Sequence, residues 1–250
     1  MMVATRLVAR SRLDATNWFR EMMMMILKNL KRFFVLSLLV QALPVSAQKK
    51  AALIGDSTVA TYSSGSKQGW GRYLASHVSG LSVSNFARGG RSSKTFYQGS
   101  EWDRALASKA KYLFIQFGHN DSNKGDPKYT DPKSSYKTYL TRFITESRKK
   151  GMSPILVTPV RRARFEGTSP TTELSAYAAA MRDVASREKV PLIDLYSISG
   201  SHYKKMGKSK TLQYFVKTDT THFNESGARL VASWVAAEAA RVVRGFPAVK

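Results

Sequence analysis

The 250-residue sequence contains no cysteine. Disulfide bonds, cysteine nucleophiles, cysteine-ligated zinc and iron–sulfur clusters are therefore excluded, as is a lipoprotein anchor on an acylated cysteine. Acidic residues are also few, since 17 Asp and Glu stand against 40 Lys and Arg and give a formal net charge of +23. Such an excess suggests polyanionic surroundings, such as nucleic acid, anionic lipid or an acidic polysaccharide. Hydrophobic residues make up 43% of the chain, which excludes a mainly disordered protein.

The sequence also lacks an apolar N-terminal run long enough to span a membrane, which requires about 20 residues. Residues 33–43 (FFVLSLLVQAL) form a shorter apolar stretch behind the basic segment 28–32. Small residues follow at Val45 and Ala47, the −3 and −1 positions of a cleavage site. This order predicts a secretory signal peptide over residues 25–47, with cleavage after Ala47. We therefore expect a secreted or periplasmic protein with no membrane attachment after cleavage.

Residues 1–24 do not suit a signal peptide, because they are basic and irregular. Four consecutive methionines occupy positions 22–25, and translation starting at Met25 would give a leader of ordinary length. Setting the leader aside leaves residues 48–250, which is the size of one domain. Most of the excess of Lys and Arg remains in this segment, so the basic character belongs to the domain itself.

Short apolar runs alternate with amphipathic stretches along residues 48–250. Five strands are expected, at residues 51–55, 81–86, 111–117, 154–158 and 191–195. Helical periodicity lies between and after them, at residues 70–78, 102–109, 134–149, 172–187 and 225–243, with Thr171 and Thr172 expected to cap the fourth helix. This alternation predicts an α/β domain with a doubly wound parallel sheet.

Polar residues follow the predicted strands, where an open parallel sheet binds its ligands. The segments concerned are Asp56–Ser57, Arg88–Ser93, Gly118–Asp121, Arg161–Arg162 and, before the last helix, Asp219–Asn224. Together they contain the groups that a hydrolase needs.

Ser57 lies on a strand-to-helix turn, where its hydroxyl can be exposed. His222 can accept the hydroxyl proton, and Asp219 can bind the other imidazole nitrogen and fix its tautomer. The N–H of Ser57, the N–H of Gly90 and the side-chain amide of Asn120 can donate to the oxyanion of a tetrahedral intermediate. The sequence therefore predicts catalytic Ser57, His222 and Asp219, with an oxyanion hole from Ser57, Gly90 and Asn120.

These segments also carry a family resemblance. Gly55-Asp56-Ser57, the block around Gly90, Gly118–Asp121 and Asp219-x-x-His222 resemble the four signature blocks of the SGNH (GDSL-type) hydrolases, in the family's order. Five longer segments are similar to the rhamnogalacturonan acetylesterase branch, namely Gly55–Val59, Gly89–Ser93, Phe117–Asp121, Val157–Val160 and Asp219–Asn224. The resemblance spans residues 51–243, and Thr58 stands where the family name records leucine.

The resemblance implies a three-layer, flavodoxin-like sheet with helices on both faces. It implies a serine esterase that needs no metal or other cofactor and that removes O-acetyl groups from pectic polysaccharide. By position it makes Ser57 the nucleophile, His222 the base, Asp219 the orienting carboxylate, and Gly90 and Asn120 the oxyanion donors.

Each of these residues also has a structural alternative. Ser57 alone would more often be a turn or helix-cap serine, and His222 alone could be a capping or core histidine. The other blocks favour catalysis for both. Asp56 is interpreted as the anchor of the nucleophile turn, and His119 as a residue that packs or hydrogen-bonds beneath the site.

Basic loop residues form a second candidate group at the same edge. Arg91, Arg161 and Arg162 are hypothesised to bind galacturonate carboxylates, because arginine binds planar carboxylates through two parallel hydrogen bonds. The alternative is a solvated basic surface with no specific contact.

The leading hypothesis is a monomeric carbohydrate O-acetylesterase whose partner is an acidic polysaccharide. The same machinery would serve acetyl-xylan, a phospholipid or a thioester. A rival of another class is a non-catalytic polyanion-binding module, which would keep full biological activity as Ser57→Ala and would be inert toward p-nitrophenyl acetate. No nucleic-acid motif and no interleaved basic–aromatic stripe supports nucleic acid as the partner.

Overall fold

Five parallel strands form the central sheet. They are β1 (Lys49–Gly55), β2 (Leu81–Asn85), β3 (Tyr112–Gln116), β4 (Ser153–Val157) and β7 (Leu192–Ile193). Their order is β2-β1-β3-β4-β7, so the chain winds outward in both directions from β1. Ala51 of β1 lies opposite Val83 of β2 and Tyr112 of β3. The predicted doubly wound parallel sheet is confirmed.

The structure is a computed structural model that describes residues 17–29 and 48–250. Residues 17–29 are helical, and Gln48–Lys250 form a separate compact unit. Most of the predicted signal peptide and its cleavage site lie outside the described residues. Among the helices that are described, none combines the length and apolarity needed to cross a membrane.

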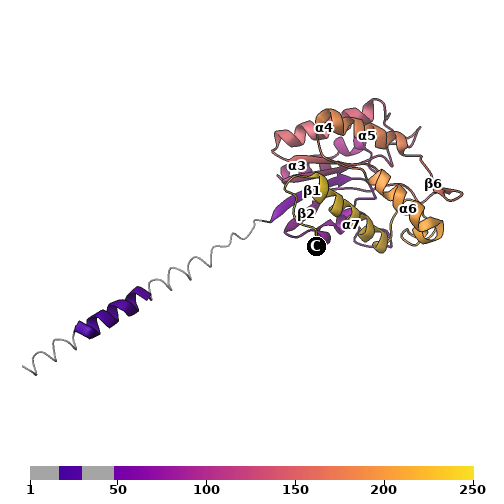
Figure 1. The fold of residues 1–250 in the computed structure, drawn as a ribbon. Helices are drawn as coiled ribbons and strands as arrows, with labels where there is room; N and C mark the ends of the chain where they lie inside the picture. The colour runs from indigo at the N-terminus through magenta and orange to yellow at the C-terminus, as the bar shows by residue number, and fades with distance from the viewer. Residues whose placement is uncertain (1–16, 30–47) are drawn as a thin grey trace, which may run out of the picture. The chain divides into compact units, whose positions relative to one another are not determined.

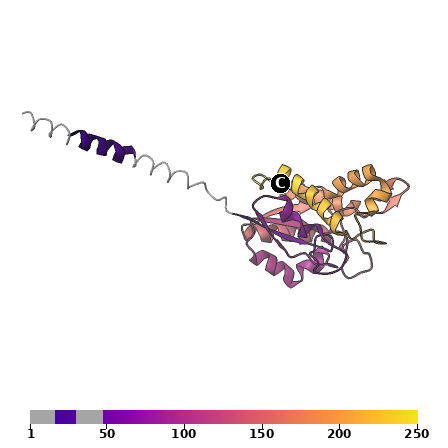
Figure 2. The same cartoon turned by 90° about the horizontal axis from the view of Figure 1, so that it is seen from below.

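Helices cover both faces of the sheet (Figures 1 and 2). One layer contains α2 (Ser93–Tyr97), α3 (Ser100–Ala107), α4 (Ser135–Lys149) and α5 (Ser175–Glu188). The other contains α6 (Leu195–Leu212), α7 (Glu225–Val242) and two short 3-10 helices, η1 (Trp70–Arg72) and η2 (Leu74–His77). The expected three-layer architecture is therefore present.

The inner strands β1, β3 and β4 are buried because both faces of the sheet are covered. In β1, the segment Ala51–Gly55 is buried throughout. Leu53 packs into the cluster that contains Trp70 and Val235, whereas its neighbour Ile54 packs into the cluster that contains Phe143. A strand buried on both faces reads as a continuous apolar run, which is why these strands could be recognised in the sequence.

Two helix predictions need correction, and the short helix α2 was not expected. Residues 70–78 form η1 and η2 rather than one α-helix, because their hydrogen bonds run from residue i+3 to i, as from Tyr73 N–H to the Trp70 carbonyl. Helix α5 begins at Ser175 with Leu174 as N-cap, so Thr171 and Thr172 do not cap it. Helix α6 was not predicted.

The sequence of α6 carries a weak helical signal. It contains two glycines, and Gly207 has a positive φ of 76° that kinks the helix. A hairpin before α5 was also not predicted. Its strands β5 (Phe165–Glu166) and β6 (Ser169–Pro170) have only two residues each, which is too short for a periodic pattern.

Candidate active site

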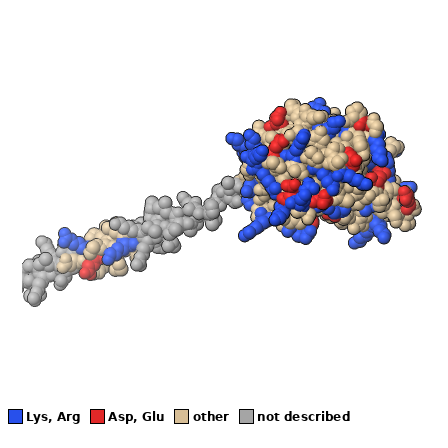
Figure 3. Space-filling view, turned by 90° about the horizontal axis from the view of Figure 1, so that it is seen from above, with Lys and Arg blue, Asp and Glu red and all other residues tan. Residues whose placement is uncertain are grey.

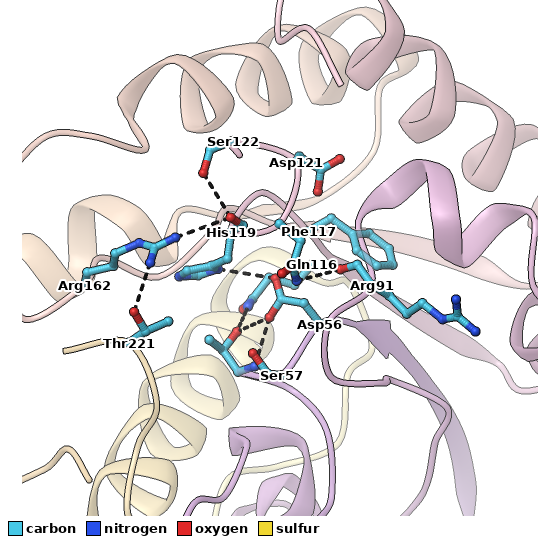
Figure 4. A network of polar contacts seen from close by, with 12 residues as sticks. Asp56, Ser57, Arg91, Gln116, Phe117, His119, Asp121, Ser122, Arg162 and Thr221 are labelled. Atoms are coloured by element: carbon cyan, nitrogen blue, oxygen red, sulfur yellow. Dashed lines mark hydrogen bonds and ion pairs between the residues drawn. The ribbon is translucent and has the colours of Figure 1, made fainter. Parts of the chain in front are cut away.

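The turn after β1 holds Ser57 in a fixed position at the carboxyl edge of the sheet. Asp56 Oδ1 accepts hydrogen bonds from Thr58 N–H at 2.9 Å and from Thr58 Oγ1 at 2.7 Å. Gly55 must be glycine here, since a Cβ would lie 2.7 Å from the Gln116 carbonyl and 2.7 Å from Val59 Cγ2. The expected role of Asp56 as an anchor of the turn is confirmed (Figure 4).

The structure brings His222 and Asp219 to Ser57. His222 Nε2 lies 2.9 Å from Ser57 Oγ, and His222 Nδ1 lies 2.6 Å from Asp219 Oδ2. The other carboxylate oxygen of Asp219 accepts from the N–H groups of Thr221 and His222 at 2.6 and 3.1 Å. Burial alone would raise the pKa of Asp219, but these hydrogen bonds and the nearby imidazole hold it below its ordinary value. Asp219 is therefore suited to remain ionised beside His222.

Two loops approach Ser57 with candidate oxyanion donors. Gly90 has a positive φ of 79°, a conformation that favours glycine. A Cβ on its neighbour Gly89 would lie 3.7 Å from Ser57 Cβ, so this loop runs past the nucleophile. Asn120 Nδ2 donates to the carbonyl of Arg91 at 2.9 Å and thereby joins the two loops. A side-chain amide has a second N–H, which is available for a ligand.

His119 lies beneath the nucleophile turn rather than beside the reacting groups. Its Nδ1 is 3.3 Å from Asp56 Oδ2, and both side chains are buried. Burial would raise the pKa of Asp56, but His119 and the hydrogen bonds from Thr58 lower it below its ordinary value. The geometry agrees with the expectation that His119 supports the site from below.

Asp121 has a role that the sequence did not reveal. It is fully buried and accepts hydrogen bonds from Ser93 N–H, Ser93 Oγ and Thr130 Oγ1. It therefore ties the start of α2, which follows the Gly90 loop, to the loop after β3. Burial raises the pKa of Asp121 to about 6 despite these hydrogen bonds. Within the ranges that the structure describes, no group of three His, Cys, Asp or Glu residues could hold a metal ion.

Arg162 is a structural link between the loop after β3 and the loop that carries His222. Its guanidinium donates from Nη2 to the carbonyl of His119 at 3.3 Å and from Nη1 to Thr221 Oγ1 at 3.0 Å (Figure 4). Its Nε lies 3.1 Å from Glu173 Oε1. These contacts involve all three nitrogens of the guanidinium and assign Arg162 a structural role.

The other two candidate arginines are also engaged within the protein. Arg91 Nη2 lies 3.1 Å from Glu101 Oε1, which Arg88 shares at 2.8 Å. Arg161 donates to three backbone carbonyls, those of Tyr196, Pro170 and Thr171. Each of the three arginines therefore has partners within the protein, and these partners could not be identified from sequence spacing.

The arrangement is that of an acyl-transfer site. A hydroxyl, an imidazole and a carboxylate form one continuous chain of hydrogen bonds, the Gly89–Gly90 loop passes close to the serine, and Asn120 is joined to that loop through the Arg91 carbonyl. Such a chain activates a serine hydroxyl without requiring it to ionise before attack.

Comparisons with known proteins agree with this chemistry. Residues 53–230 match the GDSL-like Lipase/Acylhydrolase family. The chain is 40% identical over 193 residues to the probable rhamnogalacturonan acetylesterase YesY of Bacillus subtilis, covering 74% of this chain and 89% of that protein. It is 35% identical over 204 residues to rhamnogalacturonan acetylesterase RhgT of the same organism, covering 74% and 86%.

Solved structures show the same fold. YxiM of Bacillus subtilis superposes with a TM-score of 0.71 and 29% identity, covering 80% of this chain and 58% of that one. Axe2, an acetylxylan esterase from Geobacillus stearothermophilus, superposes with a TM-score of 0.62 and 18% identity, covering 78% and 95%. The chain therefore belongs to the GDSL-like lipase/acylhydrolase family, the SGNH hydrolases, and is a serine carboxylic-ester hydrolase.

Proposed function

We propose that this esterase removes O-acetyl groups from a pectic polysaccharide, rhamnogalacturonan, using Ser57, His222 and Asp219 as its catalytic residues. The observation that carries the catalytic assignment is the continuous hydrogen-bond chain from Ser57 Oγ through His222 to Asp219. The substrate assignment is supported by the two relatives named as rhamnogalacturonan acetylesterases and by the basic character of the chain.

In the first half of the reaction, Ser57 Oγ attacks the acetyl carbonyl carbon. The hydroxyl proton passes to His222 Nε2, which lies 2.9 Å away. The tetrahedral intermediate then collapses, its bond to the sugar oxygen breaks, and His222 gives its proton to the departing sugar hydroxyl. An acetyl group remains on Ser57.

In the second half, water attacks the acetyl-enzyme. His222 takes a proton from the water and returns it to Ser57 Oγ as acetate leaves, so the enzyme is restored. Asp219 Oδ2 accepts a hydrogen bond from the Nδ1–H group of His222, with 2.6 Å between the two atoms. This contact keeps Nε2 free to accept a proton and stabilises the imidazolium that forms in both halves.

The negative oxygen of each intermediate needs donors. The N–H groups of Ser57 and Gly90 and the side-chain amide of Asn120 are the proposed set. Losing one donor of this kind typically costs about 2.7–4 kcal/mol of barrier. Because Asn120 also binds the Arg91 carbonyl, its amide is already oriented before substrate arrives.

The predicted signal peptide and the proposed polymer substrate are consistent with each other. An enzyme that acts on a large polysaccharide must meet it outside the cell. Cleavage after Ala47 would release residues 48–250 there as a monomer. This part of the proposal rests on the sequence pattern of residues 25–47.

Acetate release tests the proposal. Wild-type protein is expected to release acetate from acetylated rhamnogalacturonan and to hydrolyse p-nitrophenyl acetate, while Ser57→Ala loses both activities but still binds the polymer. Faster release from acetyl-xylan would contradict the pectic assignment. A wild type that hydrolyses no ester would contradict the catalytic assignment and favour a polyanion-binding module.

A further inference from the structure

A polar pocket lies between the β5–β6 hairpin and α6. It has a volume of about 320 Å³, at the lower end of the range for small-molecule sites. Ser169 and Pro170 of the hairpin line one side, and Ser197, Ser201 and Lys204 of α6 line the other. Strand β6 packs against α6, so the walls of the pocket belong to neighbouring elements (Figure 1).

The pocket is connected to the catalytic site through two adjacent residues. Arg161 lines it and follows β4, whose carboxyl end is at the catalytic edge. The next residue, Arg162, donates to the carbonyl of His119 and to Thr221 Oγ1, beside His222. The pocket is therefore built from segments that follow the carboxyl ends of β4 and β7, at the edge of the sheet that holds Ser57.

The guanidinium of Arg161 is held in place by the protein. Nε donates to the Tyr196 carbonyl at 3.3 Å, and Nη1 donates to the carbonyls of Pro170 and Thr171 at 3.3 and 3.0 Å. The guanidinium also lies over the Tyr196 ring, 4.1 Å from its centroid. Gly200 permits this position, since a Cβ there would lie 2.5 Å from Arg161 Nε.

These contacts leave part of the guanidinium for a ligand. Arginine has five N–H donors, and the protein contacts above involve only Nε and Nη1 of Arg161. The cost of ordering such a side chain has been met before a ligand binds, which favours affinity. An immobilised, incompletely used guanidinium is suited to an anion.

A second cation and several hydroxyls complete the pocket. Lys204 is exposed and takes part in none of the ion pairs found among the described residues. Ser169 and Ser201 offer exposed hydroxyls, and Ser197 Oγ accepts from Arg182, which leaves its own proton to donate. The carboxylate of Asp194, at the start of α6, is paired with Arg182 at 2.9 Å and so is neutralised locally.

Hydroxyl partners together with two cations match one class of ligand. The hydroxyls of a sugar ring need hydrogen-bond partners, and a carboxylate on that ring needs cations nearby. The lining supplies serines, an arginine and a lysine, and it contains no acidic side chain. We propose that this pocket is a subsite for a uronate residue of the polysaccharide, away from the ester being cleaved. The proposal rests on the proposed pectic substrate and names a recognition element for it.

Lys204 and its neighbour Lys205 provide a matched pair for the test. Both are exposed lysines on α6, but only Lys204 lines the pocket. Lys204→Ala is expected to raise KM for acetylated rhamnogalacturonan about 3- to 5-fold. Its kcat, its activity on p-nitrophenyl acetate and its KM for the carboxyl-reduced polymer should not change, and Lys205→Ala should match the wild type throughout.

A second variant fills the pocket. Ser201→Phe places a large side chain at an exposed position of the lining, so it should raise KM for both polymers while leaving p-nitrophenyl acetate hydrolysis intact. Equal effects of Lys204→Ala and Lys205→Ala would show bulk charge rather than a site. An equal loss for Lys204→Ala on the native and carboxyl-reduced polymers would show a subsite for neutral sugar. Either result overturns the proposal.

The pocket can also be tested if the pectic substrate assignment fails. Binding of deacetylated rhamnogalacturonan to the Ser57→Ala protein can be measured by calorimetry, with and without Lys204→Ala. Weaker binding for the double variant supports the uronate subsite even if acetate release is absent. Unchanged binding overturns it even if acetate release is normal.

Discussion

Two aspartates near Ser57 have opposite electrostatic environments. Asp219 accepts two backbone N–H groups and the imidazole, and these contacts hold its pKa below the ordinary value although burial acts against them. Asp121 also accepts three hydrogen bonds, but it is fully buried and is repelled by the charge of Asp56. Its pKa is therefore raised to about 6. The deeper burial of Asp121, together with the His222 imidazole beside Asp219, accounts for the difference. One carboxylate is suited to orient His222, and the other to a structural role in which it can carry a proton.

Asp121 should make the stability of this protein depend on pH. Its folded pKa of about 6 lies above the ordinary value of 3.8, so between these values the folded state binds the additional proton. The contribution of Asp121 to the free energy of unfolding is therefore fully present below about pH 4 and is lost as the pH rises to about 6. Two pKa units correspond to about 3 kcal/mol. Relative to Asp121→Asn, the free energy of unfolding of the wild type should fall by up to about 3 kcal/mol between pH 4 and pH 6.

Urea unfolding of both proteins at several pH values measures this difference. Comparing the two cancels the contributions of shared groups that do not interact with Asp121. Asp103→Asn at the surface controls for the loss of one negative charge. A constant difference between wild type and Asp121→Asn from pH 4 to 6 would contradict the assigned titration.

At the scale of elements, the segment after β4 holds the loop that carries His222. Arg162 donates to Thr221 Oγ1, Ala163 N–H donates to the Thr220 carbonyl at 2.7 Å, and Arg164 Nε donates to Thr220 Oγ1 at 3.2 Å. Arg162 adds a contact to the His119 carbonyl in the loop after β3. The position of His222 relative to Ser57 therefore depends on three loops that are distant in sequence.

Replacing Arg162 should affect turnover more than binding. Arg162→Met keeps much of the side-chain volume but removes the hydrogen bonds to Thr221 and His119. A small displacement of His222 is costly for catalysis, so kcat on p-nitrophenyl acetate should fall roughly 10- to 100-fold with little change in KM. Arg162→Lys should recover part of the loss.

Arg164→Ala is the control for that experiment, because Arg164 is exposed and contacts the same loop through Thr220. It should retain most of the activity. A large increase in KM for Arg162→Met with kcat unchanged would contradict the positioning role and restore the hypothesis of a direct substrate contact.

Features that depend on residues close together along the chain were predictable from the sequence. Strands β1, β3 and β4 were found because their apolar runs are buried on both faces, and β2 was found because its residues alternate. Asp219 and His222 were linked because they are three residues apart on one loop. The partners of Arg91 and Arg162 were not found, since arginine meets its acceptors through tertiary packing. Helix α6 was missed because its glycines and polar residues weaken the helical pattern, while burial of Leu195 and Tyr203 stabilises it in the fold.

At the scale of the whole molecule, the excess of positive charge is spread widely. Lys and Arg side chains cover much of the face that Figure 3 shows, with fewer Asp and Glu among them. A further hollow at the amino ends of the strands is lined by Lys111, Arg148, Lys189 and Arg244, on the edge opposite Ser57. Charge in this pattern raises the local concentration of a polyanion around the whole domain, in addition to any contact at the catalytic edge.

The distributed charge should make activity on an acidic polymer sensitive to salt. Mobile ions screen charges beyond a Debye length of about 10 Å at 0.1 M ionic strength, so long-range attraction to the polymer weakens as salt is added. Between 50 and 500 mM NaCl, KM for acetylated rhamnogalacturonan should rise several-fold, while kcat stays constant. Hydrolysis of p-nitrophenyl acetate and of carboxyl-reduced polymer should not respond, since neither substrate carries the charge. Equal salt dependence for charged and neutral substrates would instead indicate an effect of salt on the fold. That result would contradict the prediction that the basic surface attracts the acidic polymer.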